Sequence, residues 1–388
     1  MQSGAAIWTG MLLAAVIVVS AAAAPENQAA TDEAFSRAAS AVVDRVERED
    51  GFSGVILVAR GDHVLLRQAA GYSDRERGIR NTPDTKFTIE SVTKQFTATA
   101  IMMLVQEGKV SLDDPISKYY AASPPAWKDV TIKHLLTHSS GIEDYWVHRH
   151  ADYYDSDASK LLKSTGDIFR IVQNDPLGFR PGMGFSYSNA GYALLAEVIR
   201  KVSGASYEDF LASRIFQPLG MRNSGFGLPP GGAMKGYVRT YPEGVWRPGA
   251  PDVLEHVDIA AGAGGIYSTV DDMLIWSLAQ GTNELLSEAA RSAMFRDYGY
   301  NYGFGIRFAP KFGRELIWHT GNDAGAGFAA IFDRFPEDAL TVVAMTNNTG
   351  ITGSTATLLI EGKVQTFPAN ATRKAVEEVE RLYFGREP

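Results

Sequence analysis

Strand-like segments lie near both ends of this chain, and the stretch between them is mostly helical. Near the N-terminus, the aliphatic runs 55–59 and 64–66 flank Gly61-Asp62-His63, which predicts an antiparallel hairpin over a tight turn. The other strand signals come in the last third of the chain, at 302–308, 316–319, 328–332 and 340–345. Two chain ends that both supply strands pair most economically in one antiparallel sheet, with helices on its faces and a mostly α-helical lobe. We therefore predict an α+β fold.

Helix signals complete this outline. An apolar stripe at 35–46 predicts a helix that Thr31 caps and Gly51 ends. Further helices are expected after Asp271 and at 91–107, 131–141, 191–198, 207–216 and 374–383. Two long stretches are expected to be irregular rims around the site, 142–181 and 229–257, the second with a short strand at 236–238.

Length and the N-terminal composition set the domain prediction. Residues 5–24 are almost wholly apolar and end in small residues, which predicts a signal peptide over 1–24 and export to the periplasm or the cell exterior. A retained membrane anchor is the alternative, although the apolar run is barely long enough to span. The remaining 25–388 are expected to form one domain. Its α/β lobe would comprise about 29–100 and 258–388, and its helical lobe about 101–257.

Charge and cysteine content exclude several classes of function. The net charge is −8 and no dense Lys/Arg run is present, which argues against nucleic acid or an anionic membrane as a partner. The chain has no cysteine, so disulfides, thiolate nucleophiles and cysteine-ligated zinc are excluded. A small molecule or a peptide remains as the expected partner, with no stable membrane anchor once the signal is removed.

The segment FTIESVTKQF, residues 87–96, joins a short strand to a long apolar helix with Ser91 at the junction. The Ser91 N–H is expected among the unpaired donors of the helix N-terminus, which favour negative charge. Lys94 follows at i+3, so its amine can reach the Ser91 hydroxyl, take its proton and activate the serine without a histidine. The plain alternative is a helix-capping serine followed by a surface lysine, because about one Ser-x-x-Lys is expected by chance at this length.

Two later tripeptides can complete such a site. Tyr187-Ser188-Asn189 offers a phenol for proton transfer and an amide that can hold a substrate amide. In His319-Thr320-Gly321, His319 offers a proton carrier or positive charge and Gly321 permits a close backbone approach. The N–H of Asn322 can then form an oxyanion hole with that of Ser91. Singly these are ordinary turns, but each pattern occurs once and all three stand in order at element boundaries, which makes chance improbable.

Together the motifs resemble the serine β-lactamase and penicillin-binding protein superfamily. The resemblance is to its class C-like branch, which holds class C β-lactamases, DD-carboxypeptidases, D-aminopeptidases and esterases. It extends from about residue 31 to 348 and includes FTIESVTKQFTATAIMMLVQEGKVSLDDPI, TIKHLLTHSSGI, FSYSNAGYALLAEVI, AGAGGIYSTVDDM and WHTGNDAGAGF. The resemblance implies a β-lactamase/transpeptidase-like fold with no cofactor and no metal.

The resemblance also implies roles for the matching residues. Ser91 would be the acylated nucleophile, Lys94 the neighbouring base, and Tyr187 the group that passes a proton to the leaving group. Asn189, Thr320 and Gly321 would contact the substrate, with the oxyanion held by the N–H groups of Ser91 and Asn322. His319 departs from the lysine found in many β-lactamases. This favours a peptidase or an esterase over an efficient β-lactamase.

Other interpretations have less support or stay open. No Gly-x-Ser-x-Gly motif follows a strand, which argues against an α/β-hydrolase. A metal site at His148, His150 and Asp152 lacks His-Glu-x-x-His, so a solvated loop is the better interpretation. His134 and His138 share a helix face and are expected to be a structural pair.

The sequence thus predicts an exported serine hydrolase, foremost a DD-carboxypeptidase-like peptidase acting on D-amino-acid peptides. A β-lactamase-like esterase or a β-lactamase is the alternative. A penicillin or peptidoglycan sensor that acylates once stays open, because deacylation depends on how a water is placed.

Overall fold

The structure is a computed structural model of the 388-residue chain, and it describes most of that length. The described residues are 26–145, 165–229, 234–239, 245–249, 261–323, 325–349, 357–360, 363–366 and 371–385. The predicted signal peptide over 1–24 and the alternative metal site at His148, His150 and Asp152 lie outside them. Among the described residues, no helix is both long and apolar enough to cross a membrane.

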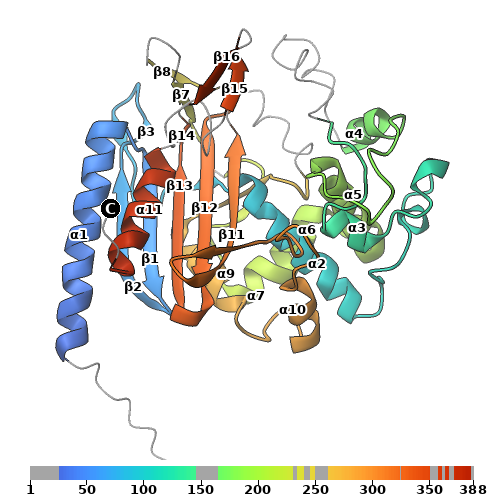
Figure 1. Ribbon diagram of the computed structural model, residues 1–388, viewed down its shortest axis with the longest axis horizontal. Helices are drawn as coiled ribbons and strands as arrows, with labels where there is room; N and C mark the ends of the chain where they lie inside the picture. Colours follow the sequence, from blue (N-terminus) through green and yellow to red (C-terminus); the bar gives the residue numbers. More distant parts are fainter. Residues whose placement is uncertain are drawn as a thin grey trace, which may run out of the picture.

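A six-stranded antiparallel sheet joins the two ends of the chain, as the sequence predicted (Figure 1). Its strand order is β10-β11-β12-β13-β1-β2, so the N-terminal hairpin pairs directly with the last long strand. The strands are β1 (Gly54–Arg60), β2 (His63–Ala70), β10 (Arg307–Lys311), β11 (Arg314–Asp323), β12 (Phe328–Phe335) and β13 (Leu340–Thr346). The α+β class is therefore confirmed.

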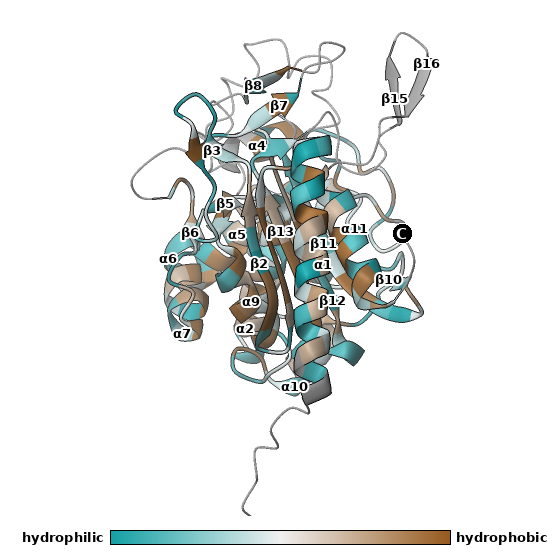
Figure 2. Cartoon of the chain, turned by 90° about the vertical axis from the view of Figure 1, so that its left-hand side faces the viewer, coloured by the Kyte–Doolittle hydropathy of each residue, from teal (hydrophilic) through white to brown (hydrophobic). Residues whose placement is uncertain are grey.

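Both faces of this sheet are covered, which explains the continuous apolar run of β1. Val55 and Leu57 enter one hydrophobic cluster, while Ile56 and Val58 between them enter a second. The second cluster lies under α1 (Glu26–Asp50) and α11 (Ala371–Tyr383), which pack side by side on that face (Figure 2). The first cluster lies under α9 (Val270–Ala279) and α2 (Thr93–Gln106).

The remaining helices pack beyond α2 and form the helical part of the molecule (Figure 1). α5 (Asn189–Ser203) is their centre, because it contacts α2, α3, α4 and α6. The others are α3 (Ile132–Leu136), α4 (Thr165–Val172), α6 (Tyr207–Leu211) with a π-helical turn over 212–216, α7 (Gln217–Leu219) and α10 (Glu288–Met294). Small sheets connect the parts, through β5 (Phe87–Thr88), β9 (Ile266–Ser268) and β6 (Gly225–Phe226), and through β14 (Asn348–Thr349), β7 (Tyr237–Arg239) and β8 (Trp246–Pro248).

Several predicted boundaries were wrong. α1 begins at Glu26 rather than after Thr31. α3 ends at Leu136 rather than near Gly141, because His138 already has a left-handed φ of 55°. The strand predicted over 302–308 begins only at Arg307, since Tyr300 and Asn301 have φ values of 62° and 54° and turn the chain. α10 was not predicted, and α4 lies in a stretch expected to be irregular.

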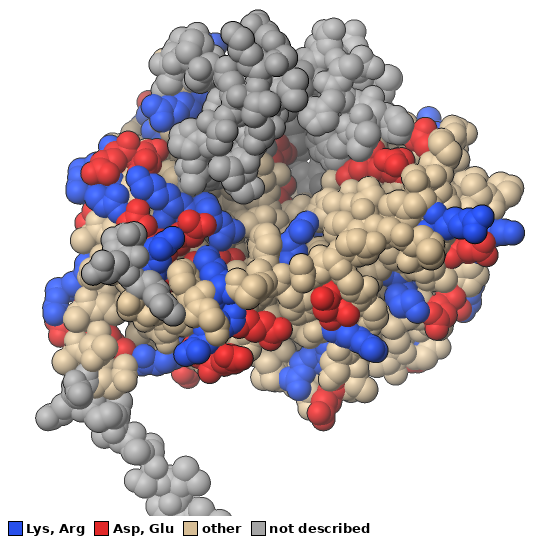
Figure 3. All heavy atoms as spheres, in the orientation of Figure 1, with Lys and Arg blue, Asp and Glu red and all other residues tan. Residues whose placement is uncertain are grey.

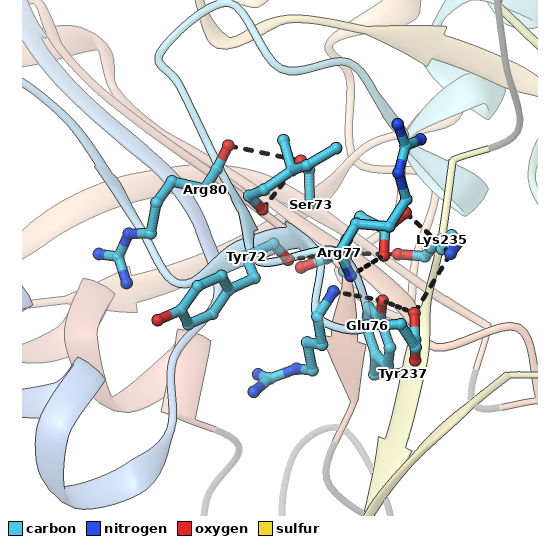
Figure 4. A network of polar contacts seen from close by, with 11 residues as sticks. Tyr72, Ser73, Glu76, Arg77, Arg80, Lys235 and Tyr237 are labelled. Atoms are coloured by element: carbon cyan, nitrogen blue, oxygen red, sulfur yellow. Dashed lines mark hydrogen bonds and ion pairs between the residues drawn. The ribbon is translucent and has the colours of Figure 1, made fainter.

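A polar network fastens β7 to the turn between β3 (Tyr72–Asp74) and β4 (Ile79–Arg80), as Figure 4 shows. The Lys235 ammonium lies 2.8 Å from Asp74 and 3.2 Å from Glu76. The Tyr237 hydroxyl donates to Glu76 at 2.8 Å and accepts from the Arg75 N–H at 2.7 Å. This anchoring holds the β7 backbone against the β11–β12 turn, where a Cβ on Gly236 would lie 1.8 Å from the Ala326 carbonyl oxygen.

The end of β11 packs without a gap against the segment that precedes α2. A Cβ on Gly321 would lie 2.1 Å from the Ile89 carbonyl oxygen and 2.6 Å from Glu90 Cβ. Glycine is therefore required at 321, because any side chain would push β11 away from Ser91.

Gly321→Ala is expected to lower the free energy of unfolding by about 1–3 kcal/mol, the usual cost of overpacking. The measurement is chemical denaturation of both proteins. Gly325→Ala, in the turn that follows β11, is the matched control, because its added Cβ would meet nothing nearer than Asp323 Oδ1 at 3.4 Å. Equal stability of the two variants would contradict the close packing at Gly321.

Candidate active site

Ser91 lies in a single 3-10 turn, η1 (Glu90–Val92), that continues directly into α2. The N-cap positions of η1 and α2 are Ile89 and Val92, and neither makes a side-chain capping bond. Ser91 is thus not a helix-capping serine. Its place at the start of the helix puts its side chain and its N–H at the positive end of the helix dipole.

Lys94 is completely buried, which excludes the surface-lysine alternative. Its Nζ lies 3.1 Å from Ser91 Oγ, 2.8 Å from Asn189 Oδ1 and 2.7 Å from the Ala263 carbonyl oxygen. Burial lowers the pKa of Lys94 to about 7, although the negative charge of Asp144 opposes this shift.

The contacts of Lys94 suit a neutral amine. Two of its partners, the Asn189 side-chain oxygen and the Ala263 carbonyl, can only accept hydrogen bonds. A neutral amine can satisfy both with its two N–H groups, which leaves its lone pair for the Ser91 hydroxyl. Lys94 can therefore remove the proton from Ser91 near neutral pH.

Tyr187 lies beside the same serine. The Ser91 side chain is near enough to stabilise the ionised form of the phenol, and the Tyr187 ring centroid lies 4.8 Å from Lys94 Nζ. Burial raises the pKa of Tyr187 well above its ordinary value. The phenol therefore holds its proton at rest, as a donor to a leaving group must.

Asn189 is oriented by a residue that the sequence analysis missed. Its side-chain oxygen accepts from Lys94, while its side-chain and backbone N–H groups donate to Asp144 Oδ2 at 2.9 and 3.0 Å. Asp144 is buried with 6% of its surface exposed. One side-chain N–H of Asn189 therefore remains free to donate to the amide of a substrate, as expected from the sequence. The only sequence signal for Asp144 was its position just after the Ser139-Ser140-Gly141 turn.

His319 lies on β11 with both ring nitrogens engaged. Nδ1 lies 2.8 Å from the Thr320 carbonyl oxygen, and Nε2 lies 3.3 Å from the Tyr302 hydroxyl. Burial, together with the charges of Lys94 and Arg307, holds the pKa of His319 well below its usual range. Of the two roles expected for His319, a positive charge is therefore disfavoured at neutral pH.

β11 continues past its partner β10 toward Ser91. β10 pairs with β11 only as far as Trp318, whereas β12 pairs with it from Ile317 to Asp323. The outer edge of β11 is thus without a β10 partner over His319, Thr320, Gly321 and Asn322. With Gly321 against Ile89, this edge adjoins η1, where the expected oxyanion hole between Ser91 and Asn322 would form.

Two carboxyl groups flank this edge. Glu90 precedes Ser91 with a strained φ of 49°, and its Oε1 accepts from Thr88 Oγ1 at 2.5 Å. Burial, and then the charge of Asp323, raises the pKa of Glu90, and burial raises the pKa of Asp323 as well. The pKa of Glu90 is raised to about 8, which keeps this carboxyl group protonated near neutral pH and limits negative charge beside the place where an oxyanion would form.

Arg307 was also missed by the sequence analysis. Its guanidinium carbon lies 5.5 Å from the Tyr187 ring centroid, 5.3 Å from that of Tyr302 and 5.5 Å from that of Trp318. Among the described residues, no carboxylate forms an ion pair with it. An arginine without a carboxylate partner beside a nucleophile is suited to an anionic group of a ligand. The sequence signal was weak, because strand arginines commonly point to solvent.

The described residues contain no group of three or more His, Asp or Glu side chains placed to hold a metal ion. Lys94, Tyr187, Asn189 and the β11 edge gather around Ser91 and come from three separate segments, which are η1–α2, residues 187–189 and β11. This geometry fits acyl transfer to a serine.

Comparison with known proteins agrees with this chemistry. The family model described as Beta-lactamase matches residues 38–360. A penicillin-binding protein of Bacillus subtilis (strain 168) is 29% identical over 318 residues, which cover 76% of this chain and 68% of that protein. Esterase EstB of Burkholderia gladioli is 32% identical over 313 residues, covering 68% of this chain and 77% of the esterase. The solved D-amino acid amidase of Ochrobactrum anthropi SV3 has a TM-score of 0.73 and 25% identity, over 91% of this chain and 99% of the amidase.

The pH dependence of kcat/KM tests the assignment of Lys94. Because the pKa of Lys94 is lowered to about 7, the neutral amine is lost below that pH, and kcat/KM is expected to fall about tenfold per pH unit on the acid side. Asp144→Asn removes a negative charge that favours the ammonium form. The variant should therefore shift the acid-side fall of kcat/KM, the acid limb of the pH profile, to lower pH. A limb that stays in place or moves upward would contradict the assignment of Lys94 as the base.

Proposed function

Because this chain belongs to the Beta-lactamase family and is a serine hydrolase, we propose that it is an exported DD-carboxypeptidase-like peptidase acting on D-amino-acid peptides. Ser91 is the nucleophile in this proposal, with Lys94 as its base and Tyr187 as the proton donor to the leaving group. Export rests on the apolar N-terminal segment, which lies outside the described residues. The face seen in Figure 3 carries basic and acidic side chains interspersed, which supports a small substrate over a nucleic acid.

The reaction follows from the contacts of Ser91. Its Oγ attacks the acyl carbon while Lys94 takes the hydroxyl proton, and the oxyanion is held by the N–H groups of Ser91 and Asn322. The bond from the acyl carbon to the leaving nitrogen then breaks as the Tyr187 phenol gives that nitrogen its proton. The ammonium of Lys94 then returns its proton to the neighbouring Tyr187 phenolate, which restores both groups. Water then attacks the acyl-enzyme and releases Ser91.

The observation that carries the peptidase proposal is the guanidinium of Arg307, which has no carboxylate partner in the part of the chain that the structure describes. Its guanidinium carbon lies 5.5 Å from the ring centroid of Tyr187, the residue proposed to protonate the leaving group. A carboxypeptidase substrate differs from an amidase or esterase substrate by a free carboxylate on its leaving group. A bidentate contact between Arg307 and that carboxylate would place the scissile bond at Ser91.

Arg307→Gln tests this contact with two matched substrates, a dipeptide ending in free D-alanine and the same dipeptide with a terminal carboxamide. The variant is expected to lower kcat/KM about 10–100-fold for the free carboxylate, because charged hydrogen bonds are worth about 1.5–3 kcal/mol. For the carboxamide, kcat/KM should change by less than threefold, and Arg307→Lys should retain part of the preference. An equal loss on both substrates would refute carboxylate binding by Arg307.

Two other functions use the same residues. An esterase or a β-lactamase would share the acyl-enzyme on Ser91, and the similarity to an esterase supports this alternative. A penicillin or peptidoglycan sensor would form the acyl-enzyme and keep it. These functions differ in the lifetime of the adduct, which can be measured directly.

The intact mass of the protein lacking residues 1–24, mixed with benzylpenicillin and sampled from seconds to hours, separates these functions. A lasting adduct is expected, and it should be absent from Ser91→Ala. A transient adduct with the drug consumed would identify a β-lactamase, and no adduct would favour an esterase or an amidase. An adduct that persists in Ser91→Ala would refute Ser91 as the nucleophile.

A further inference from the structure

His138 lies just beyond α3 in a conformation that is unusual for a histidine. Its φ of 55° is left-handed, and only 1% of its surface is exposed. The sequence analysis expected His138 to form a structural pair with His134, but the two residues do not pair. His134 instead closes a capping box with Thr131 at the start of α3, and His138 turns into the interior. A strained, buried polar residue needs a compensating role.

His138 contacts the segment that carries Tyr187 at three points. Its carbonyl oxygen accepts from the Ser186 N–H at 2.9 Å, and its ring Nδ1 accepts from the Ser188 N–H at 3.1 Å. Its ring also packs on the Tyr187 ring, with centroids 4.3 Å apart. The backbone on both sides of Tyr187 and the ring of Tyr187 itself are therefore held by one residue.

These contacts determine which ring nitrogen of His138 carries a proton. A backbone N–H can only donate, so the Nδ1 that faces Ser188 must be unprotonated. The proton of neutral His138 is then on Nε2, which lies 3.0 Å from the Tyr302 hydroxyl. His138 donates to Tyr302 in this arrangement.

The same reasoning orders His319. A carbonyl oxygen can only accept, so the His319 Nδ1 that faces the Thr320 carbonyl carries the proton. Its Nε2 is then an acceptor, and the Tyr302 hydroxyl 3.3 Å away is the donor that faces it. The Tyr192 phenol also lies near Tyr302, but its hydroxyl proton goes to the Leu136 carbonyl at 2.8 Å. An imidazole nitrogen is a stronger acceptor than a phenol oxygen, so the Tyr302 proton is directed at His319.

A directed chain of hydrogen bonds thus runs from the Tyr187 segment to the β11 edge. The order is Ser188 N–H to His138, His138 to Tyr302, Tyr302 to His319, and His319 to the Thr320 carbonyl. Tyr302 is fully buried, and His138 and His319 are almost so. The cations that face these rings are Lys94 and Arg307, which together with burial disfavour protonation of either histidine.

We propose that His138 is a positioning residue for the hydrolase. It holds the Tyr187 phenol toward Ser91, and through Tyr302 it keeps His319 neutral with its proton on Nδ1. The catalytic tyrosine and the substrate-binding edge of β11 are coupled through this chain, although they lie on separate segments. The inference rests on the proposed role of Tyr187 as proton donor to the leaving group.

Two variants interrupt the chain at separate points. Tyr302→Phe removes the hydroxyl and keeps the ring. His138→Asn keeps an oxygen that can accept from the Ser188 N–H and tolerates a positive φ, but it lacks the Nε2 donor. His134→Asn, in the adjoining α3, is the matched control, because the capping role of His134 affects folding and not the hydrogen-bond chain.

The first readout is the leaving-group dependence of kcat, measured with the p-nitroanilide and the p-nitrophenyl ester of N-acetyl-D-alanine. The anilide nitrogen must be protonated as it leaves, whereas p-nitrophenolate leaves without a proton. Tyr302→Phe and His138→Asn should therefore both lower kcat for the anilide about tenfold or more relative to the ester, with KM little changed. His134→Asn should leave this ratio at the wild-type value, and an unchanged ratio in both chain variants would overturn the proposal.

The second readout is the ring nitrogen shifts of the seven histidines, labelled with ¹⁵N. In the wild type, His138 should show the Nε2–H form and His319 the Nδ1–H form between pH 6 and 9, and Tyr302→Phe should alter the His319 signals. His319 signals unaffected by Tyr302→Phe would overturn the proposal even where neither probe is hydrolysed. Tyr187→Phe separates the two levels. If Tyr187→Phe hydrolyses the anilide normally, the proposed function of Tyr187 as proton donor fails. If Tyr187→Phe is inactive while His138→Asn and Tyr302→Phe hydrolyse the anilide normally, only the proposed role of His138 fails.

Discussion

A lysine amine with no exposure to solvent is the constraint on which the rest of this site depends. Lys94 must exchange water for protein hydrogen-bond partners, and the partners it finds are Ser91, Asn189 and Ala263. They belong to η1, α5 and the turn before β9, so the fold must bring three separate segments together around one nitrogen. Burial then lowers the pKa of Lys94 to about 7. The same packing that secures the start of α2 thereby produces a base that works near neutral pH.

Close approach of the backbone makes this convergence possible. Gly262 lies so near α5 that an added Cβ would be 2.2 Å from the Tyr192 carbonyl oxygen. Gly305 would meet the Lys94 carbonyl at 2.5 Å, and Gly321 would meet that of Ile89 at 2.1 Å. Gly305 and Gly321 border the segment from Ile89 to Lys94, and Gly262 brings the turn before β9 against α5. Each of the three excludes a side chain that would open the site. The geometry of the site therefore depends on glycine at these three positions as well as on the side chains around Ser91.

Hydrogen bonding and positive charge are provided by different residues of the site. His319 is neutral and tied into hydrogen bonds, so the position that holds a lysine in many β-lactamases contributes no charge here. The nearby positive charge comes from Arg307 on β10, which faces Tyr187 and has no carboxylate partner among the described residues. The neutral hydrogen-bonding group, His319, thus lies on β11, whereas the positive charge that can attract an anion, Arg307, lies on β10. This division suits an enzyme that recognises its leaving group by charge.

Local patterns in the sequence determined the elements and the candidate nucleophile. Alternation and turn residues predicted the β1–β2 hairpin, strands at both chain ends predicted one sheet, and the i+3 spacing of Ser91 and Lys94 predicted their contact. Each of these depends on residues close in sequence, where spacing alone decides geometry. Asp144, Arg307 and His138 were not identified as parts of the site, because each acts on a residue at least 45 positions away. Those contacts depend on the packing of α3 on α5, of α5 on α2 and of β10 on β11. The left-handed φ of His138 is tolerated because its hydrogen bonds to the Tyr187 segment compensate for the strain.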